Sequence, residues 1–557
     1  MSMRTRIKTA FTAVALAASA TAVQAQTNDF NLGRNLDIQY TVLKSLAAAY
    51  VDTVDFDKIL PVGLEAMLQS LDPYTTYIPE TAEENFEIMT TGVYGGIGSL
   101  IRKETGKGVM IFEPYAGSPA VKAGLEPGDE IIAIDGTGCF DETSEQATAR
   151  MKGQPGTDVR FLVVKGRSRD TVEVTVRRER IHLSDVKYSG IIRDSIGYIS
   201  VTGFTENMSE ELKQHVLSLK EKGIKRLVLD LRGNGGGIME EAVRTVSLFV
   251  PKGTLVVTSR GRSPMSEGAY YTREEPIDTL MPILVMTNST SASSSEIVAG
   301  ALQDLDRATI GGRRTFGKGL IQTVISTPYD SRVKFTTGKY YTPSGRCVQA
   351  IDYSHRNEDG SVGAVPDSLR KPFKTACGRT VYDGGGIAPD IEVVAPEYSR
   401  SVVSLVYNGI DGDYAIEYYK KNPQVAPPSQ FRLTDAEYED FVQYASKRDF
   451  DSRSATETML DQMYKAAERD GFDKVYGSEI AALRDKVRMD KAAMLRLKKD
   501  EILPVIEQEI AVKYYYEAGG IEVTLRSDSQ LDAVIDRWLA GEGVESWKKG
   551  QKDTDQK

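Results

Sequence analysis

The chain has 557 residues, a formal net charge of −10 and 41% hydrophobic residues. A chain of this length is too long to fold around one hydrophobic core, so we expect about three or four domains. The acidic balance argues against a nucleic-acid partner. With only 3 histidines and no paired-histidine spacing, the chain lacks the ligands of a zinc hydrolase, and we predict no metal site and no cofactor.

Residues 1–25 have the pattern of a secretory signal peptide. A basic start precedes an apolar run over residues 11–22, and the small residues at 23–25 suit a signal peptidase. The run is short for a transmembrane helix, which is the competing interpretation. We therefore expect an exported, periplasmic protein whose mature chain begins at Gln26, and membrane association stays open.

Residues 26–85 are predicted to form helices. Leu36, Tyr40 and Leu43 recur at helical spacing, and the segment from Ile59 to Leu71 favours a second helix. The Asp-Pro-Tyr sequence that follows ends this helix, because proline cannot continue it.

Residues 86–182 have a mostly β pattern. Strands are predicted over 109–112, 131–134, 159–164 and 172–176, with a short helix over 118–125. Before them stand four residues that could hold a carboxylate through their N–H groups: Gly95, Gly96, Ile97 and Gly98. An ordinary glycine hairpin explains these residues equally well. A β domain with an exposed edge can also bind a peptide as an added strand.

Residues 183–395 alternate between strand and helix patterns, which predicts an α/β core. Strands are expected over 196–201, 226–231, 283–286, 322–325 and 333–337, and a helix over 239–249. The glycine-rich turn at 230–237 lacks the GxGxxG order of a dinucleotide loop. It is either a plain tight turn or one that directs N–H groups at an oxyanion.

A serine-rich turn follows the strand over 283–286 and leads into a helix. The unpaired N–H groups at a helix start stabilise negative charge that forms beside a serine, although simple helix capping is the competing explanation. A Ser–His–Asp triad is disfavoured, because no histidine lies near this turn in the sequence.

Lys318 stands between two glycines farther along the chain. It can act as a base if burial keeps its amine neutral, and the alternative is an ordinary solvated lysine. Residues 312–318 also satisfy GxxxxGK, but the next residue is glycine rather than serine or threonine. Nucleotide binding is therefore disfavoured.

Residues 396–540 are charged and helical by pattern, with a proline-rich linker at 422–430. The longest candidate helix covers residues 479–516, and residues 541–557 form a polar tail. The sequence leaves two possibilities for the cysteines. Either Cys347 and Cys377 form a disulfide, or these two residues and Cys139 are all free thiols.

Together these motifs resemble those of the carboxyl-terminal processing proteases, also called tail-specific proteases, over residues 35–395. The family's SASASE motif is matched by residues 291–296, its TFGKGxxQ motif by 315–322 and its DLRxNxGG motif by 230–237. Its GGxxPD element is matched by 385–390. The signatures of its PDZ domain are matched at 95–98, 118–120, 123–125, 128–129 and 134–136.

The resemblance implies a multidomain α+β protein with a crotonase-like α/β protease core, an inserted PDZ domain, an N-terminal helical segment and a C-terminal helical region. It also implies a Ser–Lys dyad in which the matched positions are Ser293 as nucleophile, Lys318 as base and Gln322 as the residue that orients the lysine. The implied oxyanion hole uses the N–H of Ser294 and that of Gly235 or Gly236. Residues Gly95 to Gly98 are implied to bind the substrate's C-terminus.

The sequence departs from the family pattern at two places. Ser294 stands where the family has alanine, and an insertion over 352–382 precedes the GGxxPD element. We expect an exported serine endopeptidase that acts on proteins with accessible C-termini. The alternative is a catalytically inactive PDZ scaffold on the same core. Homodimer formation, adaptor binding and the role of the C-terminal helices stay open.

Overall fold

The computed structural model describes residues 30–547 except 105, 358, 395 and 396, so the predicted signal peptide lies outside the described residues. The chain forms two compact units. One ends at Glu80 and also contains Val324–Lys334, and the other holds the remainder. None of the helices in the described part of the chain combines the length and the apolar character needed to cross a bilayer.

The first unit contains the two predicted N-terminal helices. One covers residues 30–49 and the other is α2 (Phe56–Gln69), which ends before the predicted Asp-Pro stop. Strand β1 (Thr76–Ile78) follows and pairs antiparallel with Arg332–Lys334. Many apolar side chains of both helices are exposed, for example Tyr40 at 68% and Val62 at 70%.

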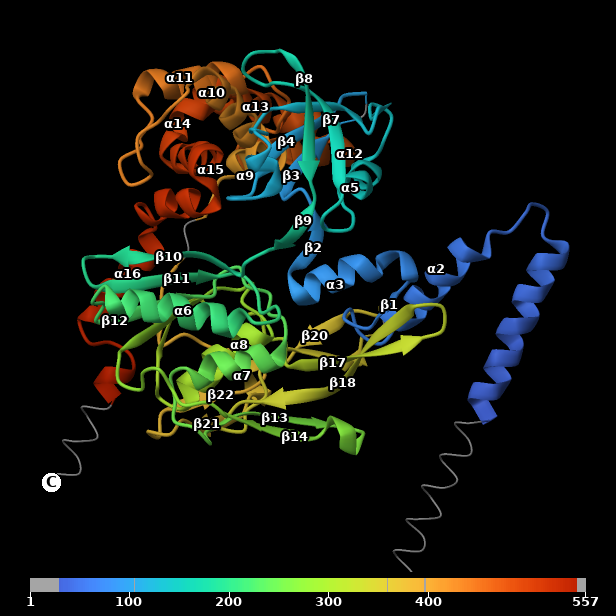
Figure 1. Cartoon of the computed structure of the whole chain (residues 1–557), viewed down its shortest axis with the longest axis vertical. Helices are drawn as coiled ribbons and strands as arrows, with labels where there is room; N and C mark the ends of the chain where they lie inside the picture. Colours follow the sequence, from blue (N-terminus) through green and yellow to red (C-terminus); the bar gives the residue numbers. More distant parts are fainter. Residues whose placement is uncertain (1–29, 105, 358, 395–396, 548–557) are drawn as a thin grey trace, which may run out of the picture. The chain divides into compact units, whose positions relative to one another are not determined.

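The second unit is built on a six-stranded sheet that confirms the predicted α/β core (Figure 1). Its first pair is antiparallel and the other pairs are parallel. In spatial order the strands are β10 (Val186–Ile192), β11 (Ile196–Val201), β12 (Arg226–Asp230), β15 (Ile283–Thr287), β16 (Thr309–Gly312) and β23 (Ile391–Glu392).

Helices cover both faces of this sheet, because its central strands are apolar on both sides. In β12, Leu227 and Leu229 pack with the buried residues of three helices, whereas Val228 packs with those of a fourth. The first face carries α6 (Met208–Glu221), α7 (Met239–Ser247) and α8 (Ser294–Asp304). The opposite face carries α16 (Ser529–Leu539), which the chain reaches only after the whole C-terminal region.

A second sheet and two small hairpins complete the core. The sheet contains β13 (Leu255–Gly261), β14 (Gly268–Tyr271) and the parts of β17 (Leu320–Thr327) and β18 (Ser331–Tyr341) that lie outside Val324–Lys334, with the 3₁₀ helix η2 (Pro264–Ser266) beside it. The predicted insertion contains β19 (Ile351–Arg356), β20 (Val362–Ala364), the 3₁₀ helix η3 (Asp367–Leu369), β21 (Pro372–Lys374) and β22 (Thr380–Tyr382). Cys347 and Cys377 are free thiols in this structure, as is Cys139.

The predicted β domain follows α3 (Glu83–Thr91) and the 3₁₀ helix η1 (Glu80–Ala82). Its sheet contains β3 (Ser99–Lys103), β4 (Val109–Pro114), β5 (Glu130–Ile134), β6 (Thr137–Gly138), β7 (Asp158–Val164) and β8 (Thr171–Arg177). A separate ribbon pairs β2 (Val93–Gly96) with β9 (Glu179–His182). Two helices, α4 (Pro119–Lys122) and α5 (Ser144–Met151), cover its core.

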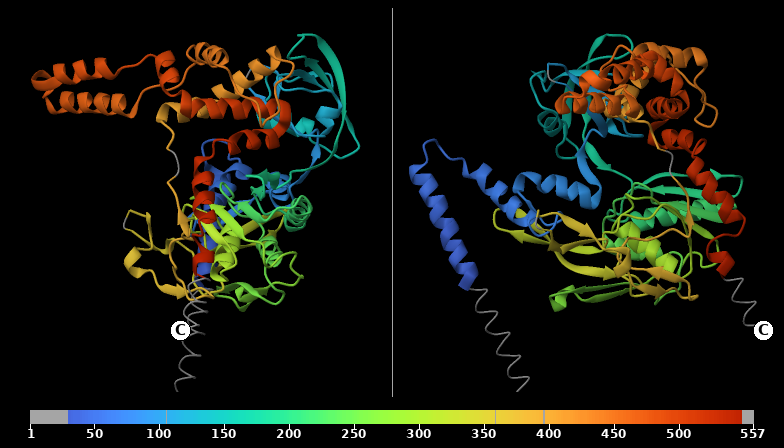
Figure 2. Two further views of the ribbon diagram at one scale, coloured as in Figure 1. Left: turned by 90° about the vertical axis from the view of Figure 1, so that its left-hand side faces the viewer. Right: turned by 180° about the vertical axis from the view of Figure 1, so that it is seen from behind.

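The C-terminal region is helical as predicted, but its boundaries differ. The helices are α9 (Arg400–Tyr407), α10 (Ile410–Lys421), α11 (Asp435–Ala445), α12 (Ala455–Asp470), α13 (Asp473–Val487), α14 (Lys491–Leu497) and α15 (Lys499–Leu525). Helices α12 and α13 lie side by side as an antiparallel hairpin (Figure 2).

The single helix predicted over 479–516 is wrong, because the chain is extended at Arg488 and Asp490 caps a new helix through Ala493 N–H. The proline-rich stretch at 422–430 is not a linker between domains. It lies inside the helical region, where the Tyr515 hydroxyl donates to the Val425 carbonyl and Arg526 donates to the Pro428 carbonyl.

Candidate active site

The serine-rich turn connects β15 to α8, and Ser293 is the residue immediately before the helix. Its backbone has φ 55° and ψ −115°, a conformation that is strained for any residue with a side chain. Such a sharp strand-to-helix turn is a common way to present a nucleophile. Ser293 is partly exposed, whereas Ser291, Ser294 and Ser295 are buried.

The hydroxyls of these three buried serines fasten the turn to the glycine-rich loop. Ser291 donates to the Leu231 carbonyl at 2.7 Å, Ser294 to the Gly237 carbonyl at 2.9 Å and Ser295 to the Asn234 carbonyl at 3.0 Å. The hydroxyls of these three serines therefore have structural partners, whereas Ser293, immediately before the helix, is partly exposed.

Glu296 links the serine turn to the loop that contains Lys318. It is fully buried, and its two carboxylate oxygens accept hydrogen bonds from Ser293 N–H at 3.0 Å and Lys318 N–H at 2.8 Å. They also accept from Gly317 N–H at 2.7 Å and the Thr315 hydroxyl at 2.6 Å. Burial raises the pKa of Glu296 to about 7, while these donors oppose the rise.

A second side chain bridges the same two backbones. The hydroxyl of Tyr340, a buried residue of β18, lies 3.1 Å from the Ser293 carbonyl oxygen and 2.5 Å from that of Lys318. The structure therefore brings Ser293 and Lys318 together although 25 residues separate them in sequence. The Lys318 side chain is half-buried.

Gln322 lies on β17, four residues beyond Lys318. It is half-buried, and its amide nitrogen donates to the Thr336 hydroxyl at 3.3 Å. Since Thr336 belongs to β18, this bond ties the start of β17 to the strand that also carries Tyr340.

The glycine-rich turn packs directly on the serine turn. A Cβ on Gly236, whose φ is +102°, would lie 2.7 Å from the Ser293 Cβ and 3.0 Å from the Ser294 nitrogen. The side chain of Asn234, which is fully buried, accepts from Gly236 N–H at 2.8 Å and donates to the Val201 carbonyl at 3.0 Å. Within the described residues, no acceptor is seen for the N–H groups of Gly235 and Ser294.

The four predicted peptide-binding residues lie beside a groove of the β domain. The groove has a volume of about 300 Å³, and Ile97, Leu100 and Ile101 line it from one side and Thr148 and Met151 from the other. Gly95 and Gly96 belong to β2 and pair with β9, and Gly98 connects to β3. Of the four residues, Ile97 is the one that lines the groove.

Sequence reasoning did not single out Glu296, Tyr340 or Asn234. Glu296 was visible as the last residue of the serine motif, three positions into the helix, where an acid is favoured. Asn234 lay inside the glycine motif. Tyr340 carries no local signal, because its role depends on a strand pairing distant in sequence.

Comparison with known proteins places these features in a family. Residues 195–355 match the model of "Peptidase family S41", residues 95–176 match "PDZ domain", and residues 402–536 match "Probable PDZ-protease, C-terminal helical domain". A solved structure titled photosystem II D1 C-terminal processing protease is 26% identical, with 63% of this chain and 88% of that chain covered at a TM-score of 0.34.

Two further relatives are carboxy-terminal processing or CtpA-like proteases by name. The carboxy-terminal-processing protease of Bartonella bacilliformis is 33% identical over 328 residues, which cover 58% of this chain and 75% of that protein. A CtpA-like serine protease of Staphylococcus aureus is 32% identical over 318 residues, which cover 56% of this chain and 62% of that protein. The predicted family and fold class are thereby confirmed: this chain belongs to peptidase family S41, with the carboxy-terminal processing proteases.

Proposed function

We propose that the chain is a serine endopeptidase in which Ser293 is the nucleophile and Lys318 the general base. The observation that carries this proposal is the shared anchoring of the two residues, since one buried carboxylate accepts hydrogen bonds from both backbones. The exposure of Ser293 beside three buried, hydrogen-bonded serines supports its choice as nucleophile.

In the proposed reaction, the neutral amine of Lys318 takes the Ser293 hydroxyl proton as the oxygen attacks the scissile carbonyl. The protonated lysine then returns the proton to the leaving amine, and an acyl-enzyme remains. Water, deprotonated by the same amine, attacks the ester and releases the acyl half of the substrate with Ser293 restored. Gln322 orients Lys318 in this scheme.

The oxyanion that forms during attack is stabilised by backbone N–H groups. Ser294 supplies one, at the start of α8 where the helix dipole favours negative charge. For the second donor, the geometry favours Gly235 over Gly236, because the N–H of Gly236 already donates to Asn234.

We assign the capture of substrate C-termini to the PDZ domain, where a peptide would add as a strand beside β3 and place its last side chain in the groove lined by Ile97 and Met151. The names of the relatives support this assignment.

The protein is proposed to be exported to the periplasm through residues 1–25. The exposed apolar side chains of residues 30–69 support a further proposal, self-association into a homodimer, and adaptor binding is a second use of the same surface.

The test is cleavage of an unfolded protein with an apolar C-terminal tail by the wild type, Ser293→Ala and Ser289→Ala. Ser289 is an exposed residue of the same loop and serves as the matched control. We expect no turnover from Ser293→Ala and normal turnover from Ser289→Ala. Turnover by Ser293→Ala would reject the nucleophile, and a wild type that binds the tail without cleaving it would favour the inactive scaffold.

A further inference from the structure

A second cavity, of about 810 Å³, lies in the protease core beside the inserted segment. Its wall includes the end of α8, the β21–β22 hairpin and residues 388–390. Five cationic side chains line it, against the two carboxylates of Asp367 and Asp390: Arg314, Arg346, Arg370, Lys374 and Arg379. In a chain whose net charge is −10, this is a local reversal of charge.

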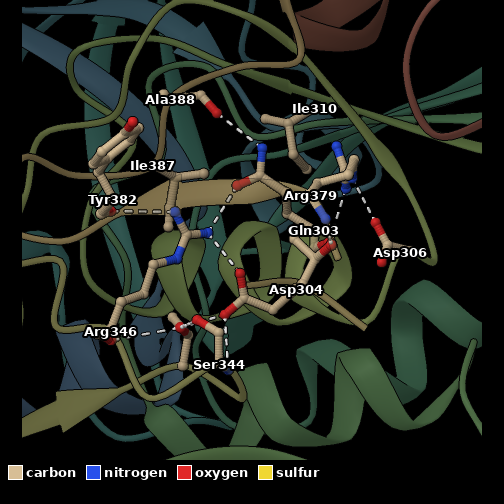
Figure 3. Close-up of polar contacts among 12 residues, drawn as sticks. Gln303, Asp304, Asp306, Ile310, Ser344, Arg346, Arg379, Tyr382, Ile387 and Ala388 are labelled. Carbon is tan, nitrogen blue, oxygen red and sulfur yellow. Dashed lines mark hydrogen bonds and ion pairs between the residues drawn. The ribbon is translucent and has the colours of Figure 1, made fainter. Parts of the chain in front are cut away.

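Two of these arginines are neutralised by buried acids (Figure 3). Arg346 lies 2.8 Å from an oxygen of Asp304 and donates to the Gln303 side chain at 2.8 Å. Arg379 pairs with Asp306 at 2.6 Å and with Asp390 at 2.5 Å. These groups are almost fully buried and form a fixed floor for the cavity.

The other cations are available to a ligand. Arg314 and Lys374 are exposed and have no carboxylate within ion-pair distance in the described part of the chain. Arg314 donates to the Gly385 carbonyl at 3.1 Å, and Lys374 donates to the Thr380 hydroxyl at 2.7 Å. Among the described residues, the one acid that pairs with Arg370 is Asp367, whose side chain is 87% exposed, so water screens that pair.

Arg314 and Arg370 converge on one residue. Arg314 binds the carbonyl of Gly385, and a Cβ on Gly385 would lie 2.7 Å from the guanidinium carbon of Arg370. Two guanidinium groups beside one residue favour the binding of an anion that both can contact. Guanidinium groups match phosphate oxygens in geometry, and a cavity of this size is typical of a small-molecule site.

We propose that this cavity binds an anion that carries a phosphate group, free or as a small monoester, with Arg314, Arg370 and Lys374 as its ligands. The site gives the inserted segment a role, because Arg370 and Lys374 both belong to it. Neither residue lies in the family motifs matched at 230–237, 291–296, 315–322 and 385–390.

The wall of the anion site also contacts the loop that contains Lys318. Gly386, next to Gly385, packs against Thr315, and Ile387 N–H donates to the Thr315 hydroxyl at 2.6 Å. That hydroxyl in turn donates to Glu296 at 2.6 Å. Thr315 therefore connects the wall of the anion site to the Glu296 carboxylate, which accepts hydrogen bonds from Ser293 N–H and Lys318 N–H. We expect the bound anion to change turnover, a readout that rests on the proposed function.

The test is calorimetric titration of the full chain with inorganic phosphate and, separately, with glycerol phosphate, at an ionic strength held constant with chloride. Arg314→Gln and Lys374→Gln are compared with Arg313→Gln and Lys371→Gln, which remove the same charge from exposed neighbours outside the cavity. All four sites are exposed, so the variants are expected to fold.

We expect saturable binding of at least one of the two phosphates and a loss of about tenfold or more in affinity for Arg314→Gln and Lys374→Gln, since each removes a charge-assisted hydrogen bond. The two control variants should bind like the wild type. Absence of saturable binding of both phosphates, or an equal loss in the controls, would overturn the proposal. Because binding is measured without substrate, this result is independent of whether the chain cleaves peptides.

Discussion

Glu296 has no contact with solvent and yet accepts four hydrogen bonds, two of them from the backbones of Ser293 and Lys318. A carboxylate with all its lone pairs engaged holds its partners within a few tenths of an ångström. The side chain touches no reacting atom in the proposed mechanism, so it is a positioning residue. Burial raises the pKa of this carboxyl from its usual value toward neutral pH.

Glu296 should make stability depend on pH. Burial raises its pKa to about 7 from an unfolded value of about 4.3, so between these values the folded state holds a proton that the unfolded state has lost. The free energy of unfolding should therefore fall as pH rises from about 4.3 to 7, by at most about 1.4 kcal/mol per pH unit from this group. Urea unfolding of the wild type and Glu296→Gln at pH 5, 6 and 7 measures the effect. An identical slope in both proteins would contradict it.

Lys318→Arg tests the base. Arginine has a side chain of similar length but stays protonated at any working pH, so it cannot accept the Ser293 proton. We expect kcat to fall by about 10²–10⁴-fold, the usual contribution of a general base. Lys339→Arg, at an exposed position of β18, is the control and should leave kcat unchanged. Substantial activity in Lys318→Arg would remove the lysine from the proposed role.

At the scale of elements, two turns from different parts of the chain form one structure. The glycine turn after β12 and the serine turn before α8 share hydrogen bonds at Ala292, Ser294 and Ser295. Both turns follow adjacent parallel strands, and the carboxyl ends of such strands meet at one edge of the sheet. The same edge is where ligands bind in open α/β sheets, which explains why the candidate nucleophile lies there.

Gly236→Ala should disrupt this contact. The new methyl group would lie 2.7 Å from the Ser293 Cβ, and the φ of +102° disfavours any side chain. We expect kcat to fall by about 10²-fold or more with helical content unchanged, because displacement of the serine turn misaligns the nucleophile. Gly235→Ala places its methyl group in open space and should cause a smaller loss. Circular dichroism measures the helical content of both variants, and steady-state kinetics measures their kcat.

The strands and helices of the core could be predicted because apolar runs and helical spacing are local signals. The site motifs at Ser293, Lys318 and Gly236 were visible for the same reason. Tyr340 was not, since its position depends on the pairing of β13 with β18. The break near Arg488 was missed because apolar spacing continues through it, and only the tertiary packing of Met494 and Leu495 selects a new helix direction.

At the scale of the larger unit, the PDZ domain packs on the C-terminal helices through aromatic and cationic side chains. The ring of Phe112, on β4, has the Arg102 guanidinium 4.1 Å from its centre and the buried Lys513 amine 3.7 Å from its centre. Burial lowers the pKa of Lys513. A further contact joins the same two regions: the guanidinium of Arg167, in the PDZ domain, lies 4.1 Å from the ring centre of Tyr419 in α10. The PDZ domain is therefore held by contacts that single substitutions can weaken.

Phe112→Ala should loosen this docking. It removes the aromatic ring that both cations contact, so it loses two cation–π contacts of about 0.5–2 kcal/mol each. The ring also packs on Gly412, where a Cβ would lie 2.6 Å from it, so a cavity would open against α10. Hydrogen exchange should accelerate in α10 and α15 while the protease core stays protected.

Phe140→Ala is the matched control for this experiment, because Phe140 belongs to the same domain and is 42% exposed. It should leave exchange in α10 and α15 unchanged. If the PDZ domain must leave this position to deliver a substrate tail, Phe112→Ala should also raise turnover of tailed substrates relative to tail-masked ones. Faster exchange with an unchanged ratio would mean that docking holds the domain without controlling access to Ser293.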